Sequence, residues 1–126
     1  ILDFNKVIEM DSEYDLAYYY RGFSKAWLED YSGSILDYNK AISLNSTDPD
    51  YFYYRGLSKA QLEDQSGAIL DFNKVIEMDS EYAAAYYYRG LRKTWLSDFS
   101  GACIDLKLSL RLGMEEAKDQ INKYCN

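Results

Sequence analysis

The 126-residue sequence contains no histidine, and this absence removes a side chain on which much catalytic and metal chemistry depends. A serine or cysteine nucleophile would have no imidazole to activate it, and a zinc site would lack its commonest nitrogen ligand. The sequence also has no glycine-rich loop of the kind that cradles phosphate. We therefore expect a protein that is not an enzyme and that holds no metal and no cofactor.

Positive charge is also scarce, because 14 Lys and Arg stand against 21 Asp and Glu, for a net charge of −7. Nucleic-acid binding depends on clustered basic side chains that release counterions, so an RNA-reading helical repeat is only a distant third hypothesis. The same charge disfavours an anionic membrane surface. No apolar run approaches the ~20 residues that span a bilayer. We expect neither a nucleic-acid nor a membrane partner.

Cysteine occurs twice, at Cys103 and Cys125, without a CxxC pair. Cys103 takes the place that Ile35 and Ile69 have in the repeats described below. We therefore expect Cys103 to be a small buried apolar side chain, and not part of a disulfide framework or a metal site. A reduced, cytoplasmic setting follows from this interpretation.

A 34-residue repeat organises what is present. The motif Tyr-Tyr-Arg-Gly occurs at 19–22, 53–56 and 87–90, and a Ser-Gly pair follows each copy at the same distance. Such a period indicates one supersecondary unit stacked into an array. We divide this single domain into the second half of a repeat (1–14), three repeats (15–48, 49–82 and 83–116) and a C-terminal capping helix (114–126).

Each repeat has the pattern of two helices, which in the first repeat cover residues 17–28 and 31–44. Asp30 is suited to cap the second of these helices, and Asn45 to end it in the left-handed conformation. Pro49 follows Asp48 at the first position of the next helix. At the ends of the sequence, the apolar stripe of Ile1, Phe4, Val7 and Ile8 has no covering helix, whereas Met114, Ala117, Ile121 and Tyr124 give the last segment one apolar side. We expect another molecule, or more of the array, to cover the first stripe.

Glycine recurs inside the first helix of every repeat, where it costs about 1 kcal/mol relative to alanine. We expect the two helices of a repeat to cross closely there. The glycines and the small residues expected opposite them are Gly22 with Ser34, Gly56 with Ala68, and Gly90 with Ala102.

Basic residues also recur in register, and two interpretations are open. They could grip an acidic ligand, or they could pair with equally repeated aspartates on the second helices, which we favour. The basic residues are Arg21, Arg55 and Arg89 with Lys25, Lys59 and Lys93, and the aspartates are Asp3, Asp37, Asp71 and Asp105.

These positions resemble the tetratricopeptide repeat family, and especially its bacterial-style tandem arrays. The sequence departs from that family by arginine at position 7 and by the absence of proline at position 32. The matching residues are Tyr18, Phe52 and Tyr86 at position 4, the three glycines at position 8, Ser34, Ala68 and Ala102 at position 20, and Tyr38 and Phe72 at position 24.

The resemblance implies an all-α fold, a right-handed superhelix of antiparallel helix pairs whose first helices line a concave groove. The family's Lys and Asn clamp for a C-terminal carboxylate is not expected, because positions 5 and 9 carry Tyr and Phe or Leu. We expect the position-5 tyrosines, with Phe23, Trp27 and Trp95, to be exposed in the groove, and the position-6 tyrosines to pack between helices. The expected groove residues are Leu16, Tyr19, Phe23, Trp27, Asp50, Tyr53, Leu57, Gln61, Tyr87, Leu91 and Trp95.

Two functional hypotheses follow from this reading of the groove. The first is a module that binds a protein or peptide partner through an aromatic, nearly uncharged surface. The second is a scaffold that associates with copies of itself through the uncovered first helix.

Overall fold

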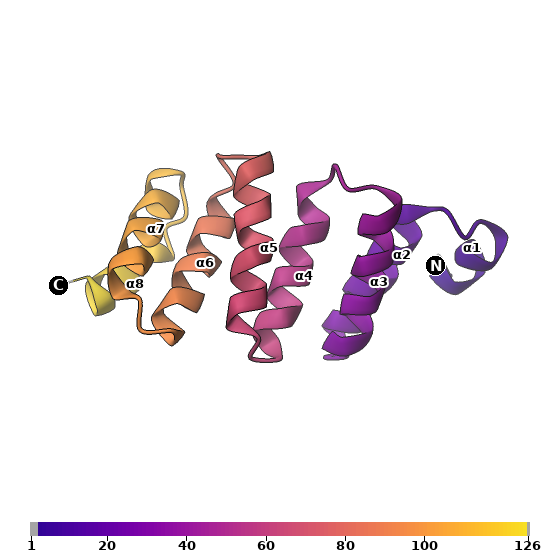
Figure 1. Ribbon diagram of the computed structural model, residues 1–126, viewed down its shortest axis with the longest axis horizontal. Coiled ribbons are helices and arrows are strands. Elements are labelled where there is room, and N and C mark those ends of the chain that lie inside the picture. Colours follow the sequence, from indigo (N-terminus) through magenta and orange to yellow (C-terminus); the bar gives the residue numbers. More distant parts are fainter. Residues whose placement is uncertain (1–2, 126) are drawn as a thin grey trace.

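The computed structural model describes residues 3–125, and every regular element in that range is an α-helix. The helices stand side by side in one row, with α1 at one end and α8 at the other (Figure 1). The all-α prediction is confirmed. Helix α1 (Phe4–Met10) precedes three pairs, α2 (Asp15–Trp27) with α3 (Tyr31–Leu44), α4 (Pro49–Gln61) with α5 (Gln65–Met78), and α6 (Ala83–Trp95) with α7 (Phe99–Arg111), and α8 (Ala117–Tyr124) closes the row.

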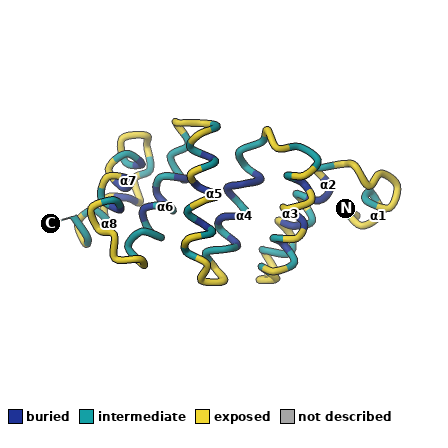
Figure 2. The backbone as a smooth tube through the Cα atoms, viewed as in Figure 1, coloured by how far each residue is buried: buried dark blue, intermediate teal, exposed yellow. Residues whose placement is uncertain are grey.

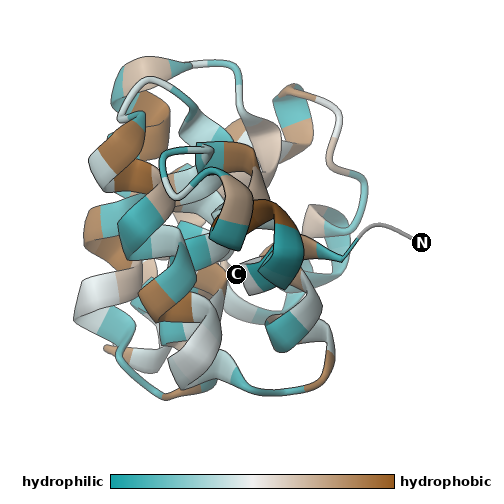
Figure 3. Ribbon diagram, turned by 90° about the vertical axis from the view of Figure 1, so that its right-hand side faces the viewer, coloured by the Kyte–Doolittle hydropathy of each residue, from teal (hydrophilic) through white to brown (hydrophobic). Residues whose placement is uncertain are grey.

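Each helix packs against the next one in the chain, and the first helices of neighbouring repeats also touch, α2 with α4 and α4 with α6. The buried residues follow the row, while exposed residues gather in the turns at its two edges and around α1 (Figure 2). Viewed along the row, hydrophobic and hydrophilic residues alternate on the helices (Figure 3). Each helix therefore buries one side against its neighbours, as expected when repeats contact only their nearest neighbours.

The core consists of successive layers between helices, and the last layer includes the end of the chain. Tyr87 and Leu106 form a buried cluster with Ala117 of α8, and Met114 and Ile121 pack against this cluster. Helix α8 thus covers the apolar side of the last pair. Ile1 of the predicted uncovered stripe lies outside the described residues. Phe4, Val7 and Ile8 are half-buried, because Phe4 stacks on Tyr20 of α2 and Ile8 packs against the cluster of Tyr18, so α2 partly covers the stripe, although no residue of α1 is fully buried.

Close crossing at the helix glycines is confirmed, although the nearest neighbours of Gly22 and Gly56 differ from those predicted. A Cβ atom on Gly56 would lie 2.8 Å from Cε1 of Phe72 and 3.2 Å from Cβ of Asp71. Gly22 has the same relation to Tyr38 and Asp37. At these two positions glycine is needed because a large ring and an aspartate of the second helix lie against it. At Gly90 a Cβ atom would lie 3.1 Å from Cγ of Leu106 and 3.2 Å from the backbone oxygen of Ala102, the small residue predicted there.

Tight turns join the two helices of each repeat. After α2, the Asp30 N–H donates to the Lys25 carbonyl at 2.8 Å and the Glu29 N–H to the Ala26 carbonyl at 2.9 Å, the pattern of a Schellman motif. Glu29 is left-handed, with φ of 65°, and so are Glu63 and Ser97. The prediction of a left-handed Asn45 is wrong, since its φ is −152°.

Aspartate caps explain the glycine of the repeated Ser-Gly pair. The carboxylate of Asp30 accepts the Gly33 N–H at 2.9 Å, which confirms the predicted cap, and Asp48 caps α4 with Pro49 at its start. A Cβ atom on Gly33 would lie 2.2 Å from Oδ2 of Asp30. The same cap recurs at Asp64 with Gly67 and at Asp98 with Gly101.

A disulfide joins Cys103 of α7 to Cys125, with a Cα–Cα distance of 5.7 Å. The prediction that Cys103 is an isolated buried apolar residue is therefore wrong. Helix α8 turns back on α7 and brings together two cysteines that are 22 positions apart in the sequence. The argument from cysteine for a reduced, cytoplasmic setting loses its basis. Within residues 3–125, no helix combines the length and the apolar character that crossing a membrane requires.

Reduction of this disulfide should destabilise the chain by about 3 kcal/mol, because the reduced unfolded state regains the freedom of the closed loop. Urea unfolding with and without dithiothreitol would measure the change. The variant Cys103→Ser should be as unstable as the reduced protein and should not respond to the reductant. An equal unfolding midpoint in both conditions would contradict a stabilising disulfide.

Candidate peptide-binding groove

The repeated arginines form structural links and are not a basic ladder open to ligands. Arg55 donates from Nε and Nη2 to the two carboxylate oxygens of Asp71, at 2.9 and 2.7 Å, and from Nη1 to Oδ1 of Asn39 at 2.9 Å. Asp71 belongs to the same repeat and Asn39 to the preceding one. We call this group of Arg, Asp and Asn the arginine clasp. It recurs as Arg21 with Asp37 and Asn5, and as Arg89 with Asp105 and Asn73.

The predicted Arg–Asp pairing is confirmed for these three arginines. Lys59 adds a second cation to Asp71, at 3.2 Å, so the buried carboxylate has two positive partners. Asp3, the fourth predicted partner, instead caps α1 by accepting the N–H groups of Asn5 and Lys6. These repeated basic residues are thus paired within the fold, and their charge is not available to a ligand in the groove.

Removal of a clasp aspartate should therefore lower the free energy of unfolding of the array. Asp71→Ala leaves Arg55 and Lys59 without their carboxylate, and we expect a loss of about 3 kcal/mol or more in the free energy of unfolding. The control is Glu77→Ala, which removes an exposed 3.7 Å pair with Lys74 and should cost less than about 1 kcal/mol. Urea titrations would compare the two, and equal losses would show that the clasp is not a stabilising feature.

Exposure along the first helices reverses the predicted order of the tyrosines. At position 5, Tyr53 and Tyr87 are buried, with 8% and 9% of their surface exposed, and Tyr19 is half-buried. At position 6, Tyr20 is 46% exposed, and Tyr54 and Tyr88 are half-buried. The prediction is wrong for position 5, because this ring enters the space between repeats, as the centroid distance of 5.0 Å from Tyr53 to Tyr82 shows. For position 6 it is confirmed at Tyr54 and Tyr88, which pack against the core between helices.

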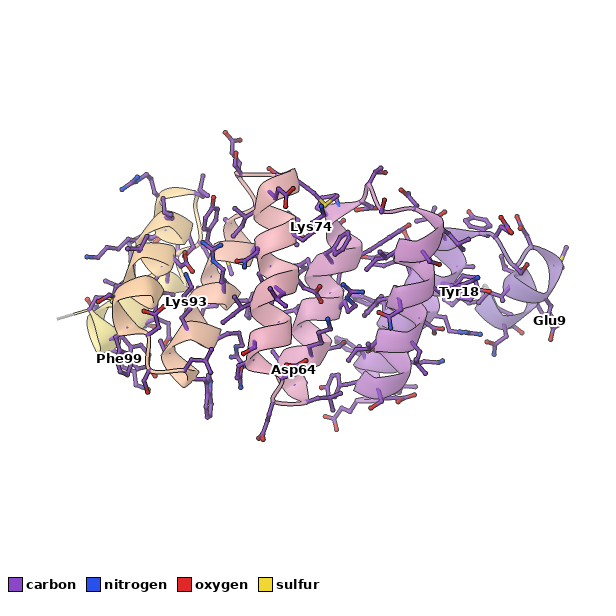
Figure 4. All side chains as sticks on the ribbon, in the orientation of Figure 1. Glu9, Tyr18, Asp64, Lys74, Lys93 and Phe99 are labelled. Atoms are coloured by element: carbon purple, nitrogen blue, oxygen red, sulfur yellow. A yellow bond between two sulfur atoms is a disulfide. The ribbon has the colours of Figure 1, made fainter. Side chains whose placement is uncertain are left out.

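Other predicted groove residues do reach the surface. Phe23, Trp27 and Trp95 are 41%, 82% and 70% exposed. Leu16 and Gln61 are also exposed, while Asp50, Leu57 and Leu91 are half-buried. Side chains project from every helix of the row (Figure 4).

A cavity of about 430 Å³ opens between the first and second helix pairs. Rings from three helices contribute to it, and Phe23 meets Tyr54 edge-on with centroids 5.3 Å apart. No charged side chain lines it. We call it the aromatic cavity, and its lining residues are Phe23, Ala26, Trp27, Tyr31, Tyr38, Tyr54, Leu57, Ser58 and Gln61.

The aromatic cavity brings together only some of the predicted residues. Phe23, Trp27, Leu57 and Gln61 meet there, whereas Tyr53 and Tyr87 belong to the core. Sequence reasoning missed contributions from the second helix, because repeat positions alone do not show how deeply one pair inserts beside the next. The only sequence signal for Tyr31 and Tyr38 is that they are aromatic, with Tyr31 next to the turn before α3 and Tyr38 near the helix crossing at Gly22.

A second cavity, of about 500 Å³, opens between the second and third pairs. Arg92 lies in its wall, and its Nη1 donates to Oε1 of Gln65 at 3.2 Å. Burial lowers the pKa of the Arg92 guanidinium. We call it the arginine cavity, and its lining residues are Ala60, Gln61, Glu63, Gln65, Arg92 and Trp95.

The Tyr54 ring in the wall of the aromatic cavity stays uncharged. Burial, followed by the nearby charge of Asp50, raises the pKa of Tyr54 above its usual value. The Asp50 carboxylate accepts the Tyr82 hydroxyl at 2.7 Å. The ring of Tyr54 is therefore neutral at pH 7.

Solved structures similar to this chain identify the architecture. The first TPR domain of Spaghetti (RPAP3), bound to the HSP90 peptide SRMEEVD, superposes with a TM-score of 0.86 over 91% of this chain and 93% of that one, at 23% identity. The fold is that of the tetratricopeptide repeat. The TPR domain of Arabidopsis OM64 gives a TM-score of 0.81 over 86% and 94% of the two chains at 21% identity.

MamA also has this tetratricopeptide-type arrangement, with a TM-score of 0.84 at 24% identity, and the match covers 91% of this chain and 67% of MamA. No protein-family model matches the chain, and no curated protein does. At these identities the likeness defines the tetratricopeptide fold, and the side chains of this chain must define what the groove binds.

Proposed function

We propose that the chain is a non-catalytic module that binds a peptide segment of a partner protein through its aromatic cavity. The observation that carries the proposal is an open, uncharged cavity whose wall includes Trp27, with 82% of its surface exposed. Leaving such a ring in water forgoes the stabilisation that its burial would give, and aromatic side chains dominate protein interfaces. A partner side chain in the cavity would cover these rings.

The repeated acidic residues support a non-catalytic role. Glu29-Asp30 and Glu63-Asp64 are the paired carboxylates that could suggest acid–base chemistry. In each pair the aspartate caps a helix and the glutamate is the left-handed residue of the turn. Their presence is therefore explained by the fold. In the similar Spaghetti structure, the same fold holds a peptide, which supports a peptide as the occupant here.

The double variant Phe23→Ala/Trp27→Ala should lose peptide binding and remain folded, because both side chains are exposed. Dodecapeptides selected on the wild-type chain from a displayed random library would serve as ligands. We expect their affinity to fall roughly tenfold or more, with unchanged circular dichroism and unfolding midpoint.

Leu36→Ala/Leu70→Ala is the matched control, since these residues are 69% and 67% exposed on the second helices and line neither cavity. The control should bind as the wild type does. Equal binding by the Phe23/Trp27 variant would contradict the proposal. Tyr53→Ala is unsuitable for this purpose, because removing a buried ring should cost about 3 kcal/mol or more of stability.

A second candidate is self-association through α1, favoured by the exposure of this helix. Met10 is 88% exposed, and Phe4 and Val7 line a shallow cavity of about 140 Å³ with Leu16 and Tyr20 of α2. An apolar face of a second copy could fill it.

Light scattering over a dilution series tests this second candidate. Self-association predicts a mass that rises with concentration, and Val7→Asp should abolish the rise by placing a charge in the contact. A monomer at every concentration would rule it out without affecting the peptide proposal.

A further inference from the structure

The two cavities occupy equivalent places at successive interfaces between repeats. Residues 34 positions apart line them, so that Trp27 corresponds to Gln61, Tyr31 to Gln65, and Ser58 to Arg92. The same architecture therefore presents an aromatic lining at one interface and a polar lining with one cation at the next.

Arg92 departs from the repeat pattern at a position that is otherwise structural. The equivalent residues are Ser24 and Ser58, and the buried hydroxyl of Ser58 is hydrogen bonded to that of Ser34 at 2.8 Å. One repeat later, Ala68 replaces Ser34 and offers no hydroxyl to a partner. The serine link is thus absent at the second interface, and a long cationic side chain lines the cavity in its place.

The guanidinium of Arg92 lacks the partners that the clasp arginines have. Its Nε is buried without a hydrogen-bond acceptor, and no carboxylate of the described chain lies within 4.0 Å of it. Gln65 supplies one neutral acceptor, at 3.2 Å. A partly buried cation with a single neutral partner is destabilising by itself. A negatively charged hydrogen-bond acceptor from a ligand would therefore bind favourably to Arg92.

We propose that the arginine cavity binds one carboxylate of the partner peptide, while the aromatic cavity holds an apolar or aromatic side chain of the same peptide. This inference rests on the proposed function and adds the chemistry of the ligand. A guanidinium binds a carboxylate through parallel N–H donors, and the amides of Gln61 and Gln65 offer further hydrogen bonds.

Charge limits how acidic this peptide can be. The chain carries a net charge of −7, and Glu63 lines the arginine cavity, so a run of acidic residues would be repelled. One carboxylate beside apolar residues fits both cavities. Tyr87 and Leu91, at positions 5 and 9 of this repeat, carry no cation, so the carboxylate site lies between repeats and depends on Arg92.

The test compares Arg92→Ser, which installs the residue of the other repeats, with the wild type. Random dodecapeptides would be displayed in two libraries, one with free C-termini and one with C-termini fused to the carrier. The wild type should enrich an aromatic or aliphatic residue together with one acidic residue or a terminal carboxylate. Synthetic peptides with Glu→Gln or an amidated C-terminus then distinguish the two sources of the carboxylate.

Arg92→Ser should weaken the carboxylate peptide roughly tenfold and leave its neutral counterpart unaffected. Glu63→Gln should strengthen the same peptide, because a competing charge is removed. Arg111→Ser, an exposed arginine of α7, is the control and should have no effect. Circular dichroism and urea unfolding would show that each variant is folded.

Three outcomes separate the two proposals. Enrichment of peptides without a carboxylate, or equal affinity of wild type and Arg92→Ser for a carboxylate peptide, would overturn this inference and leave the proposed function standing. Failure of the wild type to enrich any peptide from either library would overturn the proposed function itself.

Discussion

The arginine clasp is the interaction on which the rest of the array depends. One guanidinium joins three helices, because it binds an aspartate on the second helix of its own repeat and an asparagine on the second helix of the repeat before. It fixes both the packing within a pair and the position of one pair relative to the next. A buried carboxylate held by two cations tolerates little displacement, since separation would leave charges unpaired.

This constraint separates residues that build the array from residues that can vary. The clasp, the aspartate caps and the helix glycine recur without change in the three pairs, whereas the residues that line the cavities between pairs do not. Ser58 and Arg92 occupy the same position of successive repeats, and because this position is free to vary they give the two cavities different linings. A common scaffold can therefore carry a series of unlike binding sites.

Periodicity was sufficient to predict the helices, the aspartate N-caps and the Arg–Asp pairs of the three repeats, because each depends on residues close in the sequence or on a strict repeat. It failed for the position-5 tyrosines, since positions 5 and 6 are adjacent and only the packing of the next pair decides how far each ring is covered. It also failed for Cys103, whose partner is brought near by the return of α8. Repetition gives no signal for Arg92, because the equivalent positions of the other repeats carry Ser24 and Ser58.

The covalent bond between Cys103 of α7 and Cys125 makes the two ends of the row differ in stability. In a stack held by neighbour contacts, order is lost first at the ends. One end of the described row is tied by a bond that thermal motion does not break, while α1, at its other end, has no buried residue. Fraying should therefore progress from α1 inward, and amide protons should become more slowly exchanging toward the tied end.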